Sequence, residues 1–360
     1  MEKEFKIGLV GPSRIGKTTL ISSILDSSQD LLRGEKANIT FNDSATKSKI
    51  SEFRNERAGF LSVGEFNPGG LSSTQNKFIY SLKMNSTDSD EAKIVISFLD
   101  FPGGWIKNDV EKWEKECQPF LSESHILMLP IDATVIMEAN TNKTKALVPG
   151  LLSISEVTEI ASEWAKSRAQ MFSDDKALLL LLPVKCESYF NDNGGLKDKS
   201  AELQSKVRKL YGGLIEVVSG EFKDCIENLE VIYSPIDTYG CVEVCDTMWS
   251  DNNFEAEYKL RTPNKLNQKG ADTMLLAISK LIVNLASEKQ SSIVEEYSKK
   301  ASEDKGFFGN IWLALSGERK RRKENLKIES DALDKYKEIF KTIAVLSEKN
   351  FNPRVEKIGI

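Results

Sequence analysis

The sequence predicts an α/β fold with a mostly parallel six-stranded sheet that carries one antiparallel edge strand, followed by a helical C-terminal appendage. Short apolar, strand-like segments recur along the chain with helical stretches between them, as in proteins that join parallel strands by crossover helices. The longest apolar run, ALLLLLPV at residues 177–184, suits a strand buried on both faces. Of the 360 residues, 40% are hydrophobic, which is enough for one large core or two smaller ones.

Six segments carry the strand pattern. The second and third are separated only by the polar residues 85–92, which are too few for a crossover helix, so these two strands are expected to form an antiparallel hairpin. This hairpin would lie at the edge of the sheet. In chain order the six segments are residues 5–10, 77–84, 93–100, 125–132, 177–184 and 229–236.

Two long connections are expected between these elements. A helix over residues 18–25 follows the first strand, and the polar, weakly periodic residues 27–75 follow that helix. They are more than a compact connection requires, so we expect an enlarged insertion that is only partly helical. Residues 238–268 are expected to be irregular.

Residues 270–287 are expected to form a helix that closes the main domain, because their apolar residues mark one helical face. We therefore place the main domain at residues 1–287. Residues 288–360 are charged and helical in composition and are expected to form a C-terminal extension, with docking on the main domain favoured over partner binding. The apolar face comprises Met274, Leu275, Ile278, Leu281, Ile282 and Leu285.

Composition excludes several classes of protein. The net charge of −5 argues against a chain whose surface binds nucleic acid. The five cysteines are odd in number and irregularly spaced, which favours a reducing, cytoplasmic compartment over a disulfide framework. With His125 as the single histidine, we expect no metal site made of protein ligands alone. The start of the chain lacks a secretory signal, and no apolar run is long enough to span a membrane.

The strongest functional pattern is GPSRIGKT at residues 11–18, which fits G-x-x-x-x-G-K-[ST] between a strand and a helix. Backbone N–H groups at the positive end of a helix wrap a phosphate. Lys17 would add charge to the β- and γ-phosphates, and the Thr18 hydroxyl would ligate Mg²⁺. The nucleotide-binding residues expected here are Gly11, Ser13, Arg14, Ile15, Gly16, Lys17, Thr18 and Thr19.

A second pattern, DFPG at residues 100–103, follows an apolar strand. Asp100 can hold magnesium through water, and the Gly103 N–H can contact a γ-phosphate. An aspartate at a strand end can also simply cap the next turn. Downstream of a phosphate loop, we favour the metal-binding interpretation.

On these two motifs the chain resembles the P-loop GTPases of the translation-factor-related class, over roughly residues 4–287. The resemblance implies a site for GTP or GDP with Mg²⁺. It makes residues 27–75 an enlarged first switch region, in which Thr74, or its neighbour Ser73, reaches the magnesium and the γ-phosphate. An ordinary turn at GGLSST stays open as an alternative.

The resemblance also implies a base-reading motif at PVKCES, after the strand that ends at residue 184. The stem of Lys185 would lie over the purine, and Glu187 would replace the family's aspartate. A carboxylate there favours guanine, which offers two donors, over adenine. Val184 stands where the family has asparagine, which leaves an ATPase open. Ser234 and Pro235 would line the far side of the base.

Hydrolysis needs a separate explanation, because Gly104 stands where many GTPases carry a water-positioning glutamine. Arg14 lies inside the phosphate loop, and the pattern G-x-x-R-x-G-K is similar to that of guanylate-binding proteins and atlastins. That resemblance implies an internal arginine finger, set in place by a second subunit. A solvent-facing or salt-bridged Arg14 stays open.

We therefore expect a Mg²⁺-dependent switch that binds and hydrolyses GTP, slowly when alone, with Lys17, Arg14 and Thr74 as catalytic residues. Its layout looks like that of bacterial double-GTPase-like proteins. The alternative is a nucleotide-binding scaffold with little hydrolysis. A homodimer or a protein partner would bind through the switch regions or the C-terminal helices. The aromatic and basic residues 306–323 could contact a membrane, but packing on the chain's own domain is favoured.

Overall fold

The structure is a computed structural model, and structural statements here concern the residues that it describes. These are residues 3–63, 66, 75–87, 93–172, 175–191, 197–251, 253–261, 265–274, 277–278, 281, 342, 345–346 and 352–360.

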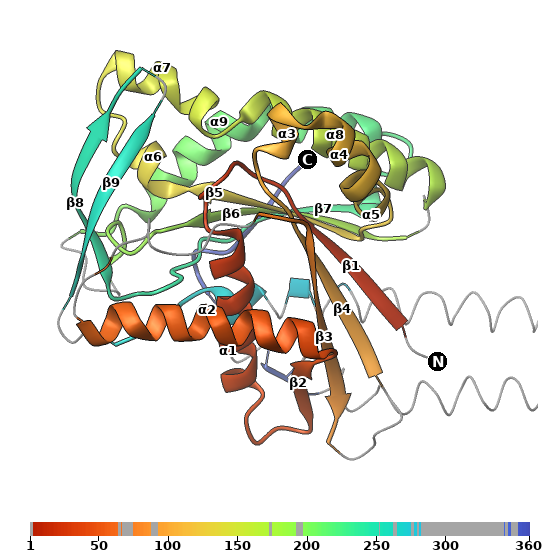
Figure 1. The fold of residues 1–360 in the computed structure, drawn as a ribbon. Helices are drawn as coiled ribbons and strands as arrows, with labels where there is room; N and C mark the ends of the chain where they lie inside the picture. Colours follow the sequence, from red (N-terminus) through yellow and green to blue (C-terminus); the bar gives the residue numbers. More distant parts are fainter. Residues whose placement is uncertain are drawn as a thin grey trace, which may run out of the picture.

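The described part of the chain contains an eight-stranded, mostly parallel sheet (Figure 1). Its strands are β1 (Lys3–Leu9), β2 (Ala37–Phe41), β3 (Phe78–Ser86), β4 (Lys93–Asp100), β5 (Ile126–Asp132), β6 (Ala177–Val184), β7 (Leu229–Tyr233) and β10 (Glu356–Ile358). The spatial order is β10-β7-β6-β5-β1-β4-β3-β2. Neighbours from β7 to β4 pair in parallel, whereas β3, β2 and β10 are antiparallel to their neighbours. The expected α/β class is confirmed.

All six expected strands are present, but the expected position of the antiparallel hairpin at the sheet edge is wrong. A further strand, β2, comes from the insertion at residues 27–75 and pairs outside β3. At the opposite edge β10 pairs with β7, so residues 356–358 form a strand rather than part of a helix. The proposed domain boundary at residue 288 stays a prediction.

Helices cover both faces of the sheet (Figure 1). On one face lie α1 (Lys17–Leu31) and α2 (Ser44–Val63). The remaining helical elements are α3 (Trp105–Asn108), α4 (Val110–Lys112), the π-helical η2 (Trp113–Cys117), α5 (Gln118–Ser122), α6 (Ala133–Met137), α7 (Asn142–Leu151), α8 (Ile154–Met171), α9 (Ser200–Glu221) and the 3₁₀ turn η4 (Ile226–Asn228).

The central strand β6 explains how one apolar run serves two cores. Leu179 and Leu181 belong to the core beneath α8 and α9, whereas Leu178, Leu180 and Leu182 belong to the core beneath α1. Because successive side chains of a strand point to opposite faces, only an uninterrupted apolar run fills both layers. The expected closing helix is helical at its described positions, and Met274, Ile278 and Leu281 are buried in the α1-side core.

Residues 238–268 are not wholly irregular as expected, because they contain a separate two-stranded sheet. It consists of β8 (Val242–Trp249) and β9 (Phe254–Leu260), paired antiparallel. The sequence FEAEYKL of β9 alternates apolar and charged residues, which is the pattern of a half-exposed strand. Tyr258 on β9 contacts the ring of Phe66, which follows α2, and thereby links this hairpin to the insertion.

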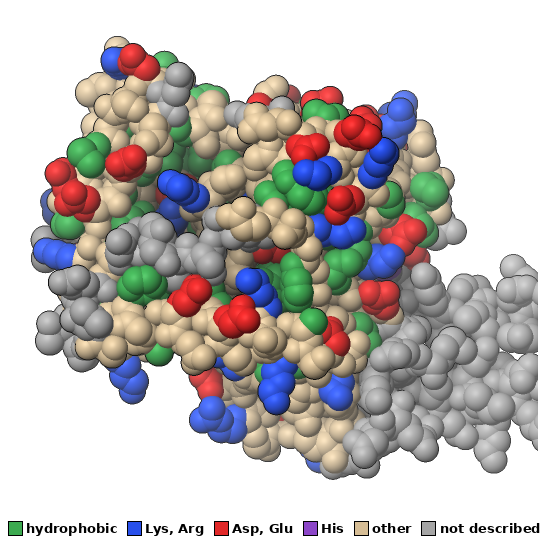
Figure 2. Space-filling model, viewed as in Figure 1, with side chains coloured by type: hydrophobic (Ala, Val, Ile, Leu, Met, Phe, Trp, Pro, Cys, Tyr) green, Lys and Arg blue, Asp and Glu red, His purple; other side chains and the backbone are tan. Residues whose placement is uncertain are grey.

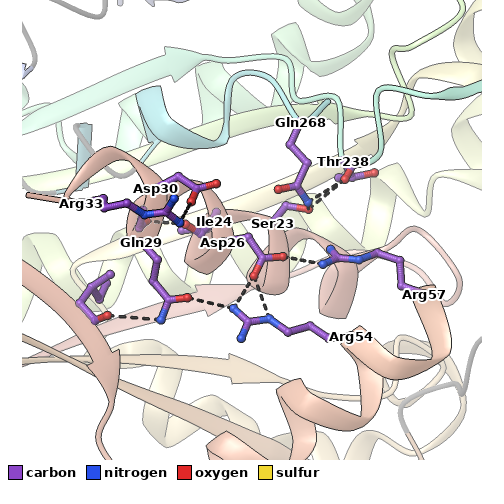
Figure 3. Close-up of polar contacts among 12 residues, drawn as sticks. Ser23, Ile24, Asp26, Gln29, Asp30, Arg33, Arg54, Arg57, Thr238 and Gln268 are labelled. Atoms are coloured by element: carbon purple, nitrogen blue, oxygen red, sulfur yellow. Dashed lines mark hydrogen bonds and ion pairs between the residues drawn. The ribbon is translucent and has the colours of Figure 1, made fainter. Parts of the chain in front are cut away.

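The α2 helix of the insertion is fixed to α1 by two arginines (Figure 3). Asp26 on α1 accepts hydrogen bonds from Arg54 Nε at 2.8 Å and from Arg57 Nη2 at 2.7 Å. The side chain of Arg57 is only 7% exposed, whereas that of Arg54 is 31% exposed. Ser23, which lies on α1 with Asp26, donates to the carbonyl of Thr238. Side chains of α1 therefore contact both the insertion and the loop after β7.

We predict that Arg57→Met lowers the free energy of unfolding by about 2 kcal/mol, because it removes a buried hydrogen bond between charged groups. Arg54→Met is the comparison variant, since it removes more exposed hydrogen bonds to the same carboxylate and to Gln29. Its cost should stay under about 1 kcal/mol. Urea unfolding of both variants measures the difference, and equal losses would contradict the assigned roles.

Candidate nucleotide site

The phosphate loop lies where β1 ends and α1 begins. Gly16 is the N-cap of α1 with φ 103°, a left-handed conformation that glycine adopts without strain. Arg14 also has a positive φ, at 62°. Both residues turn the chain tightly into the helix, whose N-terminal turn is the place where backbone N–H groups bind an anion in proteins of this kind.

Lys17, the first residue of α1, places its charge inside the loop. Its Nζ donates to the carbonyl of Gly11 at 3.0 Å and to that of Pro12 at 3.1 Å. Burial lowers the pKa of Lys17, and the nearby carboxylate of Asp100 opposes this shift. A desolvated ammonium held by loop carbonyls is positioned for a phosphate.

Thr18 and Asp100, which are far apart in the chain, meet beside this loop. Thr18 Oγ1 donates to Asp100 Oδ2 at 2.8 Å, at the end of β4. Tyr80 on β3 lies next to them, and burial, followed by the charge of Asp100, raises the pKa of its hydroxyl group. A hydroxyl and a carboxylate are oxygen donors of the kind that Mg²⁺ takes, together with phosphate oxygens.

These residues fit a magnesium ion that the nucleotide helps to hold. Among the described residues no group of three or more His, Cys, Asp or Glu side chains could hold a metal ion. Coordination of Mg²⁺ by Thr18 and Asp100 together with nucleotide phosphates stays a prediction.

Gly103 packs directly against the phosphate loop. A Cβ atom built on it would lie within 3.0 Å of backbone atoms of Gly11, Pro12 and Ser13. Only glycine allows this approach, which brings the DFPG turn onto the loop. The next residue, Gly104, is the N-cap of α3 with φ −68°.

The predicted base-reading residues lie at the ends of β6 and β7. Lys185 Nζ forms an ion pair with Asp132 and lies 3.5 Å from the carbonyl oxygen of Arg14, so the lysine contacts the phosphate loop. Asp132 is also the N-cap of α6, where its Oδ1 accepts from the N–H of Thr134 at 2.9 Å. This carboxylate therefore fixes the lysine beside the loop.

Glu187 organises the loop that follows β7. Its Oε1 accepts hydrogen bonds from the N–H groups of Tyr239 at 3.0 Å and Gly240 at 3.3 Å. The side chain is buried, and burial raises the pKa of Glu187 against these hydrogen bonds. Both contacts use the same oxygen. Contact of Glu187 with a purine stays a prediction.

The structure brings most of the predicted site residues together at the carboxyl ends of the parallel strands. Asp100 is the last residue of β4, and the phosphate loop, Lys185 and Ser234 follow β1, β6 and β7 respectively. Parallel strands place these carboxyl ends together. Pro235 and Glu187 lie on the same two loops. Thr74, Ser73 and the segment 306–323 lie outside the described residues.

Sequence reasoning missed Asp132, Tyr80 and Arg261. Arg261 follows β9 and donates from Nη2 to the carbonyl of Glu187 at 2.9 Å. Asp132 could have been found, because it ends a buried parallel strand just as Asp100 does. Tyr80 and Arg261 carry no local pattern, since only tertiary pairing brings them to the site.

The glycine-capped helix, the lysine inside the loop and the threonine paired with a strand-end aspartate define the class of P-loop nucleotide-binding proteins. A family model described as Double-GTPase 2 matches residues 6–188, just over half of the chain, and the chain belongs to this family. Membership points to GTP binding and hydrolysis. No curated protein matches the chain.

Two further expectations concern the surface. On the face shown in Figure 2, lysines and arginines are interspersed with aspartates and glutamates, and the expectation that the chain does not bind nucleic acid stays a prediction. None of the described helices is long and apolar enough to cross a membrane.

Proposed function

We propose that the chain is a Mg²⁺-dependent molecular switch that binds GTP and hydrolyses it to GDP and phosphate. The observation that carries the proposal is the 2.8 Å contact between Thr18 and Asp100, which joins the two predicted motifs beside Lys17. Bound Mg²⁺ would neutralise phosphate charge. The loop N–H groups and Lys17 bind the β- and γ-phosphates, and the Gly103 N–H contacts the γ-phosphate. We assign to Thr74, in the first switch region, a further contact to the magnesium ion and the γ-phosphate.

Guanine specificity is the first test of this proposal. We predict that the parent protein binds GTP in preference to ATP, and that Glu187→Gln reduces this preference on the order of 10²-fold, because the amide presents an N–H group to the guanine donors. Glutamine keeps an oxygen for Tyr239 and Gly240, so the loop should persist. A competition titration with the two nucleotides measures the ratio.

The control for this titration is Glu243→Gln, which changes a carboxylate that accepts from Arg261, the residue that also donates to the backbone carbonyl of Glu187. Its preference for GTP should equal that of the parent. Equal affinity of the parent for ATP and GTP would contradict the assignment of the base motif and favour the ATPase left open by Val184.

Activation by self-association is the second test. We predict that hydrolysis per molecule rises with protein concentration and that Arg14→Ala removes this rise with little change in GTP affinity, because an arginine finger acts on the transition state. A fully engaged finger is worth roughly 10³ to 10⁵ in rate. The control is Arg33→Ala, an exposed arginine just after α1 that forms an ion pair with Asp30 of that helix. A rate that stays flat over a wide concentration range would contradict this role.

A second candidate function is a nucleotide-dependent scaffold with little hydrolysis. Gly104 favours it, because this position lacks a side chain that could orient water. Single-turnover hydrolysis by the purified protein separates the two functions, since a scaffold leaves the bound GTP intact.

A further inference from the structure

The space around Gly104 is open to a side chain and bordered by two polar groups. A Cβ atom built on Gly104 would lie 3.6 Å from Asn108 Nδ2 and 3.9 Å from Ser13 Oγ, both ordinary van der Waals distances. The φ of −68° suits any residue. Glycine is therefore not required here by space or by backbone conformation, in contrast to Gly103.

The two polar groups belong to different segments of the chain. Ser13 belongs to the phosphate loop and is exposed. Asn108 ends α3, and its backbone N–H donates to the carbonyl of Gly104 at 2.8 Å. The close packing of Gly103 on Ser13 fixes the distance between the loop and α3. The Ser13 hydroxyl and the Asn108 amide therefore both lie within 4 Å of the Cβ position of residue 104.

We propose that the Ser13 hydroxyl, assisted by the Asn108 amide, orients the water that attacks the γ-phosphate, in place of a side chain at position 104. The inference rests on the proposed GTP hydrolysis. A hydroxyl both donates and accepts hydrogen bonds. Ser13 can therefore accept a hydrogen bond from the water molecule and so orient the water oxygen toward the γ-phosphorus. Asn108 supplies a second polar contact to the same water.

The reaction balances without a protein group that keeps the proton. The water oxygen forms a bond to the γ-phosphorus, and the bond from that phosphorus to the β–γ bridging oxygen breaks. Its electron pair stays on GDP, and the protons of the water leave with inorganic phosphate or pass to solvent. Ser13 orients the water and is unchanged at the end.

The test compares Ser13→Ala with the parent protein in single-turnover hydrolysis of GTP. We expect the rate to fall on the order of 10²-fold, while the affinities for GTP and GDP stay within about twofold. Binding of GDP with aluminium fluoride, which imitates the attacked γ-phosphate, should weaken along with the rate. Ser13→Thr keeps the hydroxyl and is the matched control that should retain activity.

A second variant tests the geometry. Adding Gly104→Gln to Ser13→Ala should restore at least tenfold of the lost rate, because a Cβ atom at position 104 meets its neighbours only at ordinary contact distances and the added amide can orient the water. Hydrolysis by Ser13→Ala at the parental rate would overturn the proposal that Ser13 orients the water. Equal losses of GDP affinity and rate would overturn it too, since they indicate a structural role. A parent that hydrolyses no GTP would overturn the proposed function, and this inference with it.

Discussion

Lys17→Ala is expected to weaken binding of GTP and GDP on the order of 10²-fold or more, because it removes the buried charge that lies inside the phosphate loop. The ammonium is already desolvated and held by the carbonyls of Gly11 and Pro12. Its contacts to phosphate therefore need little reorganisation. Titration with a fluorescent GTP analogue measures the loss.

The control for this variant is Lys6→Ala, which removes a lysine of β1 that pairs with Glu123 outside the phosphate loop. Its nucleotide affinity should equal that of the parent. A folded Lys17→Ala protein that binds GTP as tightly as the parent would contradict the assignment of the loop.

Gly103→Ala is expected to reduce single-turnover hydrolysis on the order of 10²-fold, because the added methyl group forces the DFPG turn away from the phosphate loop. The displaced turn moves the Gly103 N–H away from the γ-phosphate, whereas GDP makes no contact there. Affinity for GDP should therefore change little. A variant as active as the parent would contradict the contribution of this turn to hydrolysis.

Gly104→Ala provides a control only one residue away. Its methyl group would meet Asn108 and Ser13 at ordinary contact distances, so the turn can stay in place. Only the Gly103→Ala variant is expected to force the DFPG turn off the loop, because only its methyl group meets backbone atoms at less than 3.0 Å. Comparable losses in both variants would point to an effect of chain stiffness instead.

The sequence was sufficient to predict the site wherever a local pattern carries the chemistry. The phosphate loop and Asp100 are recognisable because strand, turn and helix follow one another directly, and their meeting at the sheet edge follows from parallel pairing. The buried strand β6 was equally clear, because both of its faces need apolar residues.

The remaining features depend on contacts between distant segments. β2 and β10 have few residues, and pairing with β3 and β7 decides their conformation. Asp132 and Lys185 meet only because β5 and β6 are neighbours. The base-reading motif predicts that the Glu187 carboxylate faces a base. No sequence pattern shows that this carboxylate also accepts a hydrogen bond from the backbone N–H of Tyr239, in the loop after β7.

The pairing of β10 with β7 changes how the C-terminal region should be dissected. Leu281 is buried in the core and Glu356–Ile358 lie in the sheet, so the intervening segment is anchored at both ends. Glu356 also contacts Gln204 and Arg208 on α9. A truncation after residue 287 would remove β10 and leave β7 as the edge strand with unpaired backbone groups, which promotes aggregation. An internal excision that retains residues 342–360 keeps both β10 and the buried Leu346 of the α1-side core, and so avoids this artefact.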